Sequence, residues 1–386
     1  MANVIDGVEG PRVHQSIRLL IDKLVGLSDE SKEFLYHLPD GRILDTKSWD
    51  GWDWTHGVGL YGIWKYYELT GDPRHLGLIE AWFASHFDKN INTMSVFLTL
   101  AYVYEKTGNQ TYLPWLEAWA EWAFHDLPRT EYGGMQHITY VKENAQQLWD
   151  DTLMMTALPL AKIGKLLNRP QYVEEALRQM LILIQYLFDN QTGLFFHGWK
   201  FEPTAEGKTG HHFAEARWAR GNSWLTIVIP EMLELIENDS SSPALGALRS
   251  HLINTLTAQC RALAQLQEPD SGLWRTLLDV PSSEGSYPEA SATAGFAYGI
   301  LKARRKHLLP NETGLAHLSR TYDEIALLAI KGILANISPD GELLQTSFGT
   351  GMGDTLQFYK DIPLTSMPYG QAMAIIALVE FSRKFY

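Results

Sequence analysis

Cysteine is nearly missing from this sequence, because Cys260 is the only one among 386 residues. A lone cysteine excludes an intrachain disulfide and a cysteine-rich metal site. The HExxH zinc signature is also missing, and the adjacent His211 and His212 would point in different directions in regular structure. We therefore expect no metal ion, and we expect Cys260 to be a small buried apolar residue.

An excess of positive charge and long apolar runs are missing too. Lys and Arg number 32 against 45 Asp and Glu, so the formal net charge is −13, which argues against nucleic acid or an anionic membrane as a partner. No stretch approaches the roughly 18 uncharged apolar residues of a membrane helix. Asp6 and Glu9 interrupt the N-terminal segment before any apolar run, unlike a secretory signal, so a cytoplasmic location is expected.

Signatures of nucleotide binding and serine-hydrolase chemistry are likewise missing. The chain contains no GxGxxG, no GxxxxGK[ST] and no Gly-x-Ser-x-Gly. The segment 221–224, Gly-Asn-Ser-Trp, matches the last pattern only in its first three positions. No cofactor is therefore expected.

Helical periodicity is what the sequence has in abundance. In 146–167, for example, Leu153, Met155, Leu158 and Ile163 recur with a period near 3.6 residues. Twelve segments have helical spacing or composition: 11–26, 56–70, 74–87, 93–107, 111–126, 146–167, 170–188, 222–237, 243–267, 289–306, 316–336 and 369–386.

The connections between these segments are of two kinds. Tight polar turns at 70–73, 107–110 and 167–170 end one helix and begin the next. Longer linkers rich in aromatic residues, such as 189–195 and 270–274, suit the walls of a binding site. The alternation predicts an all-α fold, an (α/α)6 barrel of six helical hairpins forming one domain over 1–386. An open helical solenoid is the alternative.

Aromatic residues gather beside hydrogen-bonding side chains. The 13 Trp and 17 Tyr include three such groups. They are Trp49, Trp52, Trp54 and His56; Phe196, His197 and Trp199; and Trp218, Arg220 and Trp224. A sugar ring has apolar faces and a polar rim, so flat aromatic platforms with such neighbours fit a carbohydrate site, although tryptophan also fills space between helices.

Two acids open one predicted helix. Asp150 and Asp151 precede an apolar stripe that includes Met155 and Leu158. Burial beside apolar neighbours raises the pKa of a carboxyl group, as a general acid requires. The alternative is a helix cap. We expect Asp150 to be the cap and Asp151 the acid, although the sequence alone does not separate them.

Four motifs occur in the same order as in glycoside hydrolase family 105, the unsaturated rhamnogalacturonyl hydrolases, and the chain resembles this family. They are WDDTLMM at 149–155, FHGW at 196–199, WARGNSW at 218–224 and EASATAGF at 289–296, with NINT at 90–93 before them. The similarity runs from about Trp52 to Tyr369. It implies an (α/α)6 barrel and an unsaturated oligosaccharide as substrate. It also implies hydration of the C4=C5 vinyl ether of a 4,5-unsaturated galacturonic acid, typically releasing rhamnose.

The resemblance also implies site residues. Asp151 is the implied acid and water activator. Trp218, Arg220 and Trp224 match positions lining the sugar site, and we infer that Arg220 binds the uronate carboxylate. The remaining implied substrate-binding residues are His197, His137, Trp54, His56 and Asn92.

Alternatives remain open. The unsaturated glucuronyl hydrolases of family 88 carry a second essential acid in the early barrel helices, whereas the corresponding 90–100 segment here contains no Asp or Glu. An ordinary inverting glycosidase would need a second carboxylate, such as Glu215, Glu289 or Asp354. A sugar-binding barrel without catalysis is a third possibility. The loop 347–369 is expected either to help select the neighbouring sugar or to cover the barrel.

Overall fold

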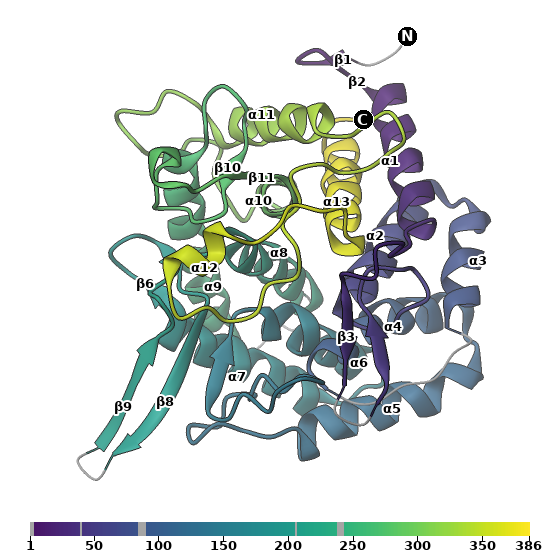
Figure 1. Ribbon diagram of the computed structural model, residues 1–386, viewed down its shortest axis with the longest axis vertical. Coiled ribbons are helices and arrows are strands. Elements are labelled where there is room, and N and C mark those ends of the chain that lie inside the picture. The colour runs from purple at the N-terminus through teal and green to yellow at the C-terminus, as the bar shows by residue number, and fades with distance from the viewer. Residues whose placement is uncertain (1–3, 39–40, 84–89, 205–206, 238–242) are drawn as a thin grey trace.

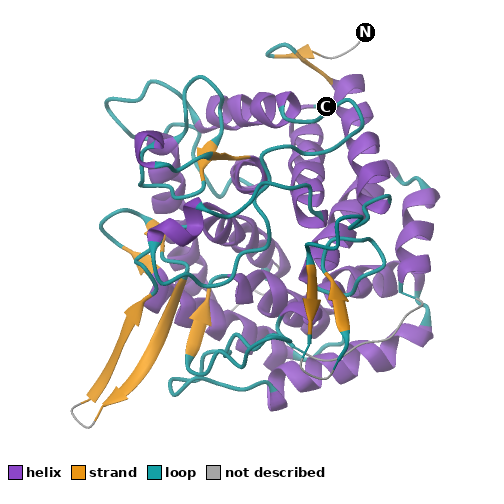
Figure 2. Ribbon diagram, viewed as in Figure 1, coloured by secondary structure: helices purple, strands orange, loops and turns teal. Residues whose placement is uncertain are grey.

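Long helices make up most of this chain (Figures 1 and 2). The computed structural model describes residues 4–38, 41–83, 90–204, 207–237 and 243–386. The helices are α1 (Gly10–Val25), α2 (Trp54–Thr70), α3 (Pro73–Trp82), α4 (Val96–Thr107), α5 (Leu113–Glu121), α6 (Leu158–Leu166), α7 (Pro170–Leu187), α8 (Ala219–Leu235), α9 (Pro243–Leu266), α10 (Ala290–Arg305), α11 (Tyr322–Ala335), α12 (Leu356–Lys360) and α13 (Pro368–Phe385). Every predicted segment overlaps one of them, although 84–87 lie outside the described residues. The short α12 was not predicted.

The helices fall into an inner and an outer set. The inner helices α2, α4, α6, α8, α10 and α13 contact one another in that order, and α13 contacts α2 again. Each also packs against one outer helix, in the pairs α2–α3, α4–α5, α6–α7, α8–α9, α10–α11 and α13–α1. In α13 every residue from Pro368 to Ser382 is buried. The outer α7 buries one stripe that includes Val173, Met180 and Leu187, which is the pattern of a helix with one face in water.

The inner helices all begin at the same end of the molecule. One cavity is lined by residues at the starts of α2 and α13 and just before α4 and α6. A second cavity is lined by residues near the C-terminal ends of α2, α4, α8, α10 and α13. Each outer helix runs from the end where one inner helix finishes back to the end where the next inner helix begins. The loops before the inner helices therefore lie at the same end of the molecule.

Short strands accompany the helices of this mostly helical chain. The pairs are β1 (Val4–Ile5) with β2 (Val8–Glu9), β3 (Leu35–His37) with β4 (Ile43–Asp45), β6 (Phe188–Asp189) with β7 (Leu194–Phe195), and β10 (Trp274–Arg275) with β11 (Pro288–Glu289). A three-stranded sheet has the order β5 (Gln147–Trp149), β8 (Gly198–Thr204) and β9 (Gly207–His212), and its β8–β9 hairpin projects from the helical body (Figure 2). The strands lie in the long linkers, whose backbone groups need partners that helices cannot supply.

Two predicted helix starts were wrong. The segment predicted to begin at 146 first forms β5, because Gln147, Leu148 and Trp149 pair with strand β8. The helix predicted from 316 begins at Tyr322, where Thr321 and Glu324 form a capping box. Cys260 is buried as expected. Among the described helices, none is both long and apolar enough to cross a bilayer.

Candidate functional site

A cavity of about 490 Å³ opens at the end of the molecule where the inner helices begin. Its wall combines residues just before or at the start of inner helices with parts of β3 and β4, the segment 139–144 and the loop 348–354. Trp54, Asn92, His137 and Asp151 line it together. The acid predicted from the sequence therefore shares one cavity with three of the predicted substrate-binding residues. Along the chain, Asn92 lies 38 residues after Trp54, and His137 lies 45 residues after Asn92.

Asp151 is held by groups from two other elements. The indole Nε1 of Trp224 donates a hydrogen bond to Oδ1 of Asp151 at 3.1 Å, and the ring nitrogen Nε2 of His197 lies 3.3 Å from Oδ2. Burial on its own would raise the pKa of Asp151, but its interactions with His197 outweigh burial and lower that pKa to about 2. The sequence predicted a raised pKa for Asp151 because it did not place His197 beside it.

Asp150 takes the environment that was expected for Asp151. Its side chain is fully buried against the Cα atom of Gly221, and no described group hydrogen-bonds to either carboxyl oxygen. Burial and the adjacent Asp151 carboxylate raise the pKa of Asp150 well above its usual range. Asp150 is therefore not a hydrogen-bonding helix cap but a buried carboxyl group that favours its protonated form.

The two histidines near Asp151 differ in position. His197 is buried behind Asp151, where its Nδ1 hydrogen-bonds with the Tyr359 hydroxyl at 2.8 Å. His137 lines the cavity and stacks on Trp149, with ring centroids 4.2 Å apart. Burial lowers the pKa of His137 to about 4, so this ring is neutral near pH 7 and offers hydrogen bonds rather than charge.

Trp54 provides an aromatic wall to the cavity. It begins α2 and stacks on Tyr369 of α13, with ring centroids 4.5 Å apart and planes 21° from parallel. The edge of its ring also meets Trp224. Its side chain is only partly buried, so the indole presents surface to the cavity on which an apolar sugar face can lie.

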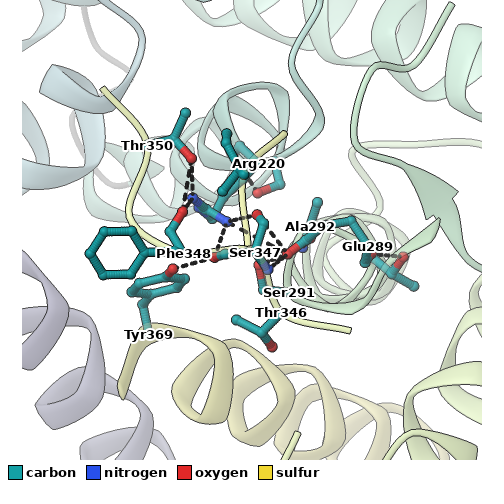
Figure 3. Close-up of polar contacts among 12 residues, drawn as sticks. Arg220, Glu289, Ser291, Ala292, Thr346, Ser347, Phe348, Thr350 and Tyr369 are labelled. Atoms are coloured by element: carbon teal, nitrogen blue, oxygen red, sulfur yellow. Dashed lines mark hydrogen bonds and ion pairs between the residues drawn. The ribbon is translucent and has the colours of Figure 1, made fainter. Parts of the chain in front are cut away.

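Arg220, which the sequence analysis expected to bind the substrate carboxylate, does not line this cavity. Its guanidinium is fully buried and holds the chain at 347–350 (Figure 3). Nη1 donates to the Ser347 carbonyl at 3.0 Å and to its hydroxyl at 2.5 Å, and Nη2 donates to the Phe348 carbonyl at 3.0 Å and the Thr350 hydroxyl at 2.9 Å. Glu289 lies 3.5 Å away as the counter-charge. The geometry makes Arg220 an anchor of the loop that carries part of the cavity wall.

Trp218 and His56 also lie outside the cavity wall. Trp218 is buried between the His197 ring and the Arg220 guanidinium, so it supports both. His56 is buried against Trp82 and hydrogen-bonds through Nε2 with the Ser48 carbonyl at 2.6 Å. Of the predicted substrate-binding residues, these two and Arg220 support the cavity at a distance, while Trp224 and His197 contact Asp151.

Known proteins resemble this chain over most of its length. Residues 27–385 match the family model described as Glycosyl Hydrolase Family 88. Two solved structures, each described as a possible member of the GH105 family, superpose with a TM-score of 0.90. One, from Klebsiella pneumoniae, is 57% identical and covers 100% of this chain and 96% of its own. The other, from Salmonella enterica, is 56% identical and covers 98% and 96%.

The chain belongs to glycoside hydrolase family 105. This family 105 enzyme is also 30% identical over 339 residues to the unsaturated rhamnogalacturonyl hydrolase YesR of Bacillus subtilis, covering 85% of this chain and 89% of that protein. It is an unsaturated uronyl hydrolase of the type shared by families 88 and 105.

Several residues that line the cavity of this family 105 enzyme were not predicted from the sequence. Asp53 lines the cavity beside Trp54, and Tyr36, Lys142 and Asn144 contribute from segments that carried no motif. The sequence did contain a signal for Asp53, because this acid lies inside the aromatic segment 49–54. The prediction for that segment was based on its tryptophans and not on its acid.

The other acids offered for an inverting glycosidase lie in different places. Asp354 lines the cavity at its exposed rim, together with residues 348–352. Glu289 is buried, where it caps α10 and accepts a hydrogen bond from the Ser347 backbone at 2.9 Å. Glu215 is exposed and is not part of the cavity wall. The loop expected to influence the neighbouring subsite thus does contribute to the wall.

Within the described residues, one group has the composition of a metal site. Asp150, Asp151 and His197 each place a potential ligand atom within 4.8 Å of the others. In this arrangement the Nε2 atom of His197 lies 3.3 Å from Oδ2 of Asp151, and Asp150 favours its protonated form, which does not coordinate metal.

Proposed function

We propose that this enzyme is an unsaturated rhamnogalacturonyl hydrolase. It removes 4,5-unsaturated galacturonic acid from the non-reducing end of oligosaccharides that a lyase has cut from rhamnogalacturonan. The named activity of YesR supports this substrate, and the cavity has the aromatic wall and polar rim that a sugar requires. The fold is proposed to be an (α/α)6 barrel in one domain over 1–386. The contact of α13 with α2 supports a closed barrel over an open solenoid.

The reaction proceeds by addition of water to the C4=C5 vinyl ether. Protonation at C4 leaves an oxocarbenium-like centre at C5, and water then adds at C5. The resulting hemiketal opens to a 5-keto-4-deoxyuronate and releases the next sugar. A carboxylate close to C5 stabilises the positive centre and accepts a proton from the attacking water.

Asp151 is proposed to be that carboxylate and also the acid that delivers the proton to C4. The observation that carries this role is its place in the cavity wall, where the Trp224 indole donates a hydrogen bond to Oδ1 and Nε2 of His197 lies 3.3 Å from Oδ2. Trp54 is the proposed platform for the sugar, and Asn92 and His137 are proposed hydrogen-bonding partners of its hydroxyl groups. Arg220, Trp218, Trp224, His197 and His56 are proposed to position these groups.

The test uses unsaturated galacturonyl-rhamnose and its saturated counterpart. Loss of the double-bond absorbance with the first substrate, no release of rhamnose from the second, and deuterium at C4 of the product in heavy water are the expected results. An ordinary inverting glycosidase would cleave the saturated disaccharide and leave C4 unlabelled. Asp151→Asn is expected to lose turnover by about 10²–10⁴-fold while still binding substrate.

A further inference from the structure

Tyr359 is a buried phenol directly behind the histidine that faces Asp151. It lies on the short helix α12, its side chain is fully buried, and it is not part of the cavity wall. Its hydroxyl group lies 2.8 Å from Nδ1 of His197, and the other ring nitrogen of that histidine, Nε2, lies 3.3 Å from Oδ2 of Asp151. The three side chains therefore contact one another in series, and only Asp151 reaches the cavity.

The hydroxyl group of Tyr359 has two further neighbours, which decide where its hydrogen points. The backbone N–H of Gly353 donates to the hydroxyl oxygen at 3.3 Å, and the sulfur of Met352 lies 3.7 Å from that oxygen. Burial raises the pKa of Tyr359, so the phenol keeps its proton. Sulfur is a weak acceptor, whereas an imidazole nitrogen at 2.8 Å is a good one. The O–H of Tyr359 therefore donates to Nδ1 of His197.

The bond to Nδ1 fixes the tautomer of His197. A neutral imidazole carries one hydrogen, so an Nδ1 atom that accepts a hydrogen bond leaves that hydrogen on Nε2. Nε2 of His197 and Oδ2 of Asp151 are both buried, and neither has another hydrogen-bonding partner among the described residues. A hydrogen on Nε2 gives both atoms a partner, whereas a hydrogen on Nδ1 would set two lone pairs against each other whenever Asp151 is ionised.

We propose that Tyr359 is a positioning residue that holds His197 as the Nε2–H tautomer, so that the ring donates to Oδ2 of Asp151. This assignment rests on the proposed function. When Asp151 gives its proton to C4, its carboxyl group becomes a carboxylate, and Nε2–H stabilises that charge together with the Trp224 indole at Oδ1. The attacking water then returns a proton to Asp151, and the same two donors hold the carboxylate in place to receive it.

The tautomer can be measured directly by nitrogen-15 NMR of the His197 ring in the substrate-free enzyme, with His197→Gln identifying the resonances. At about pH 8, above the ordinary pKa of histidine, the wild type should give the shifts of an Nε2–H ring. Tyr359→Phe should give a mixture of both tautomers, and Tyr298→Phe should match the wild type. Tyr298 on α10 is equally buried, but it donates to Glu231 at the other end of the inner helices.

Turnover of the unsaturated substrate gives a second measurement. Tyr359→Phe should lower kcat by about tenfold with little change in KM, because Tyr359 contacts the histidine and does not line the cavity. His197→Gln keeps an amide N–H near the position of Nε2 but has no ring whose tautomer must be set. Adding Tyr359→Phe to that variant should therefore cost less than about twofold. This non-additivity separates a role through His197 from a general loss of packing.

The two proposals fail on different results. An Nδ1–H ring in the wild type overturns the role of Tyr359, and this result needs neither a folded variant nor activity. A Tyr359→Phe enzyme with a raised KM at unchanged kcat, or with an equally large loss in the His197→Gln background, overturns it as well. A wild type that leaves the unsaturated substrate intact overturns the proposed function, and the positioning role then falls with it whatever the tautomer of His197.

Discussion

The indole nitrogen of Trp224 donates a hydrogen bond to the Asp151 carboxylate at 3.1 Å, joining helix α8 to the residue at which the helical turn before α6 begins. Trp224 is fully buried, so this bond forms out of contact with water. A hydrogen bond to a charged group is worth about 1.5–3 kcal/mol, enough to favour the ionised carboxylate markedly. The bond to Trp224 therefore stabilises the charged form of Asp151.

Trp224→Phe should reduce turnover through Asp151. Loss of the N–H donor raises the pKa of Asp151, so the acid limb of kcat/KM should move to higher pH, and kcat should fall by about tenfold. The matched control is Trp274→Phe, since Trp274 is equally buried but donates to the Leu263 carbonyl away from the cavity. Both variants should lose stability, and only the first should change the pH profile. The same profile in both variants would contradict the role given to this bond.

Asp150→Asn should change how stability depends on pH. The pKa of Asp150 is raised in the folded state above its ordinary value of 3.8, so its stabilising contribution is complete below that value and is lost as the pH rises through the raised pKa. Asn cannot ionise, so the melting temperature of the variant should rise relative to the wild type as the pH increases above about 4. Melting curves of the variant, the wild type and the exposed control Asp270→Asn would measure this. Parallel curves for all three would exclude the buried, protonated carboxyl.

Arg220→Lys should loosen the loop at 347–350. Lysine is a point donor and cannot reproduce the planar set of bonds to Ser347, Phe348 and Thr350. Lysine keeps the positive charge beside Glu289 but loses hydrogen bonds that hold the loop, which should cost about 1.5–3 kcal/mol of unfolding free energy, and KM should rise because the loop carries part of the cavity wall.

The control for this substitution is Arg217→Lys. Arg217 forms ion pairs with Asp189 and Asp279 and is partly exposed, so its replacement should cost less than about 1 kcal/mol. Denaturant unfolding and Michaelis kinetics on both variants provide the comparison. Equal losses in the two proteins would show that Arg220 has no special structural role.

Gly221→Ala should destabilise the enzyme and disturb its acidic pair. A methyl group at this position would overlap the Asp150 carboxyl group, which lies against the Cα atom. At Gly77 in α3 a methyl group meets nothing within 4 Å, so Gly77→Ala should instead stabilise the helix by about 0.5–1 kcal/mol. Chemical unfolding of the two variants should therefore give changes of opposite sign, and a gain of stability in Gly221→Ala would contradict the close packing of Asp150.

Periodicity located the helices because an apolar stripe is a local property of a segment. The same property misled at 146–149, where Leu148 continues the apolar pattern but the backbone pairs with β8 instead. Strand pairing depends on a partner about 50 residues away, at Gly198–Lys200, which no window on the sequence contains. The sequence located Asp151 and Trp54 because each belongs to a continuous segment with a recognisable pattern. It did not show which of the predicted residues line the cavity and which lie behind its wall.

The sequence by itself determined the inner and outer helices and the acids and aromatic residues at their starts, because these are encoded within single turns and segments. Only the tertiary structure decided which of those acids keeps a proton. The neighbouring His197 lowers the pKa of Asp151, while burial without an ion-pair partner raises the pKa values of Asp150 and Asp53. Likewise Arg220 met Ser347, 127 residues further along the chain, instead of the cavity. The charge state and the hydrogen-bond partners of a buried side chain depend on residues from other helices that pack against it. A short segment of sequence does not show which distant residues become its neighbours.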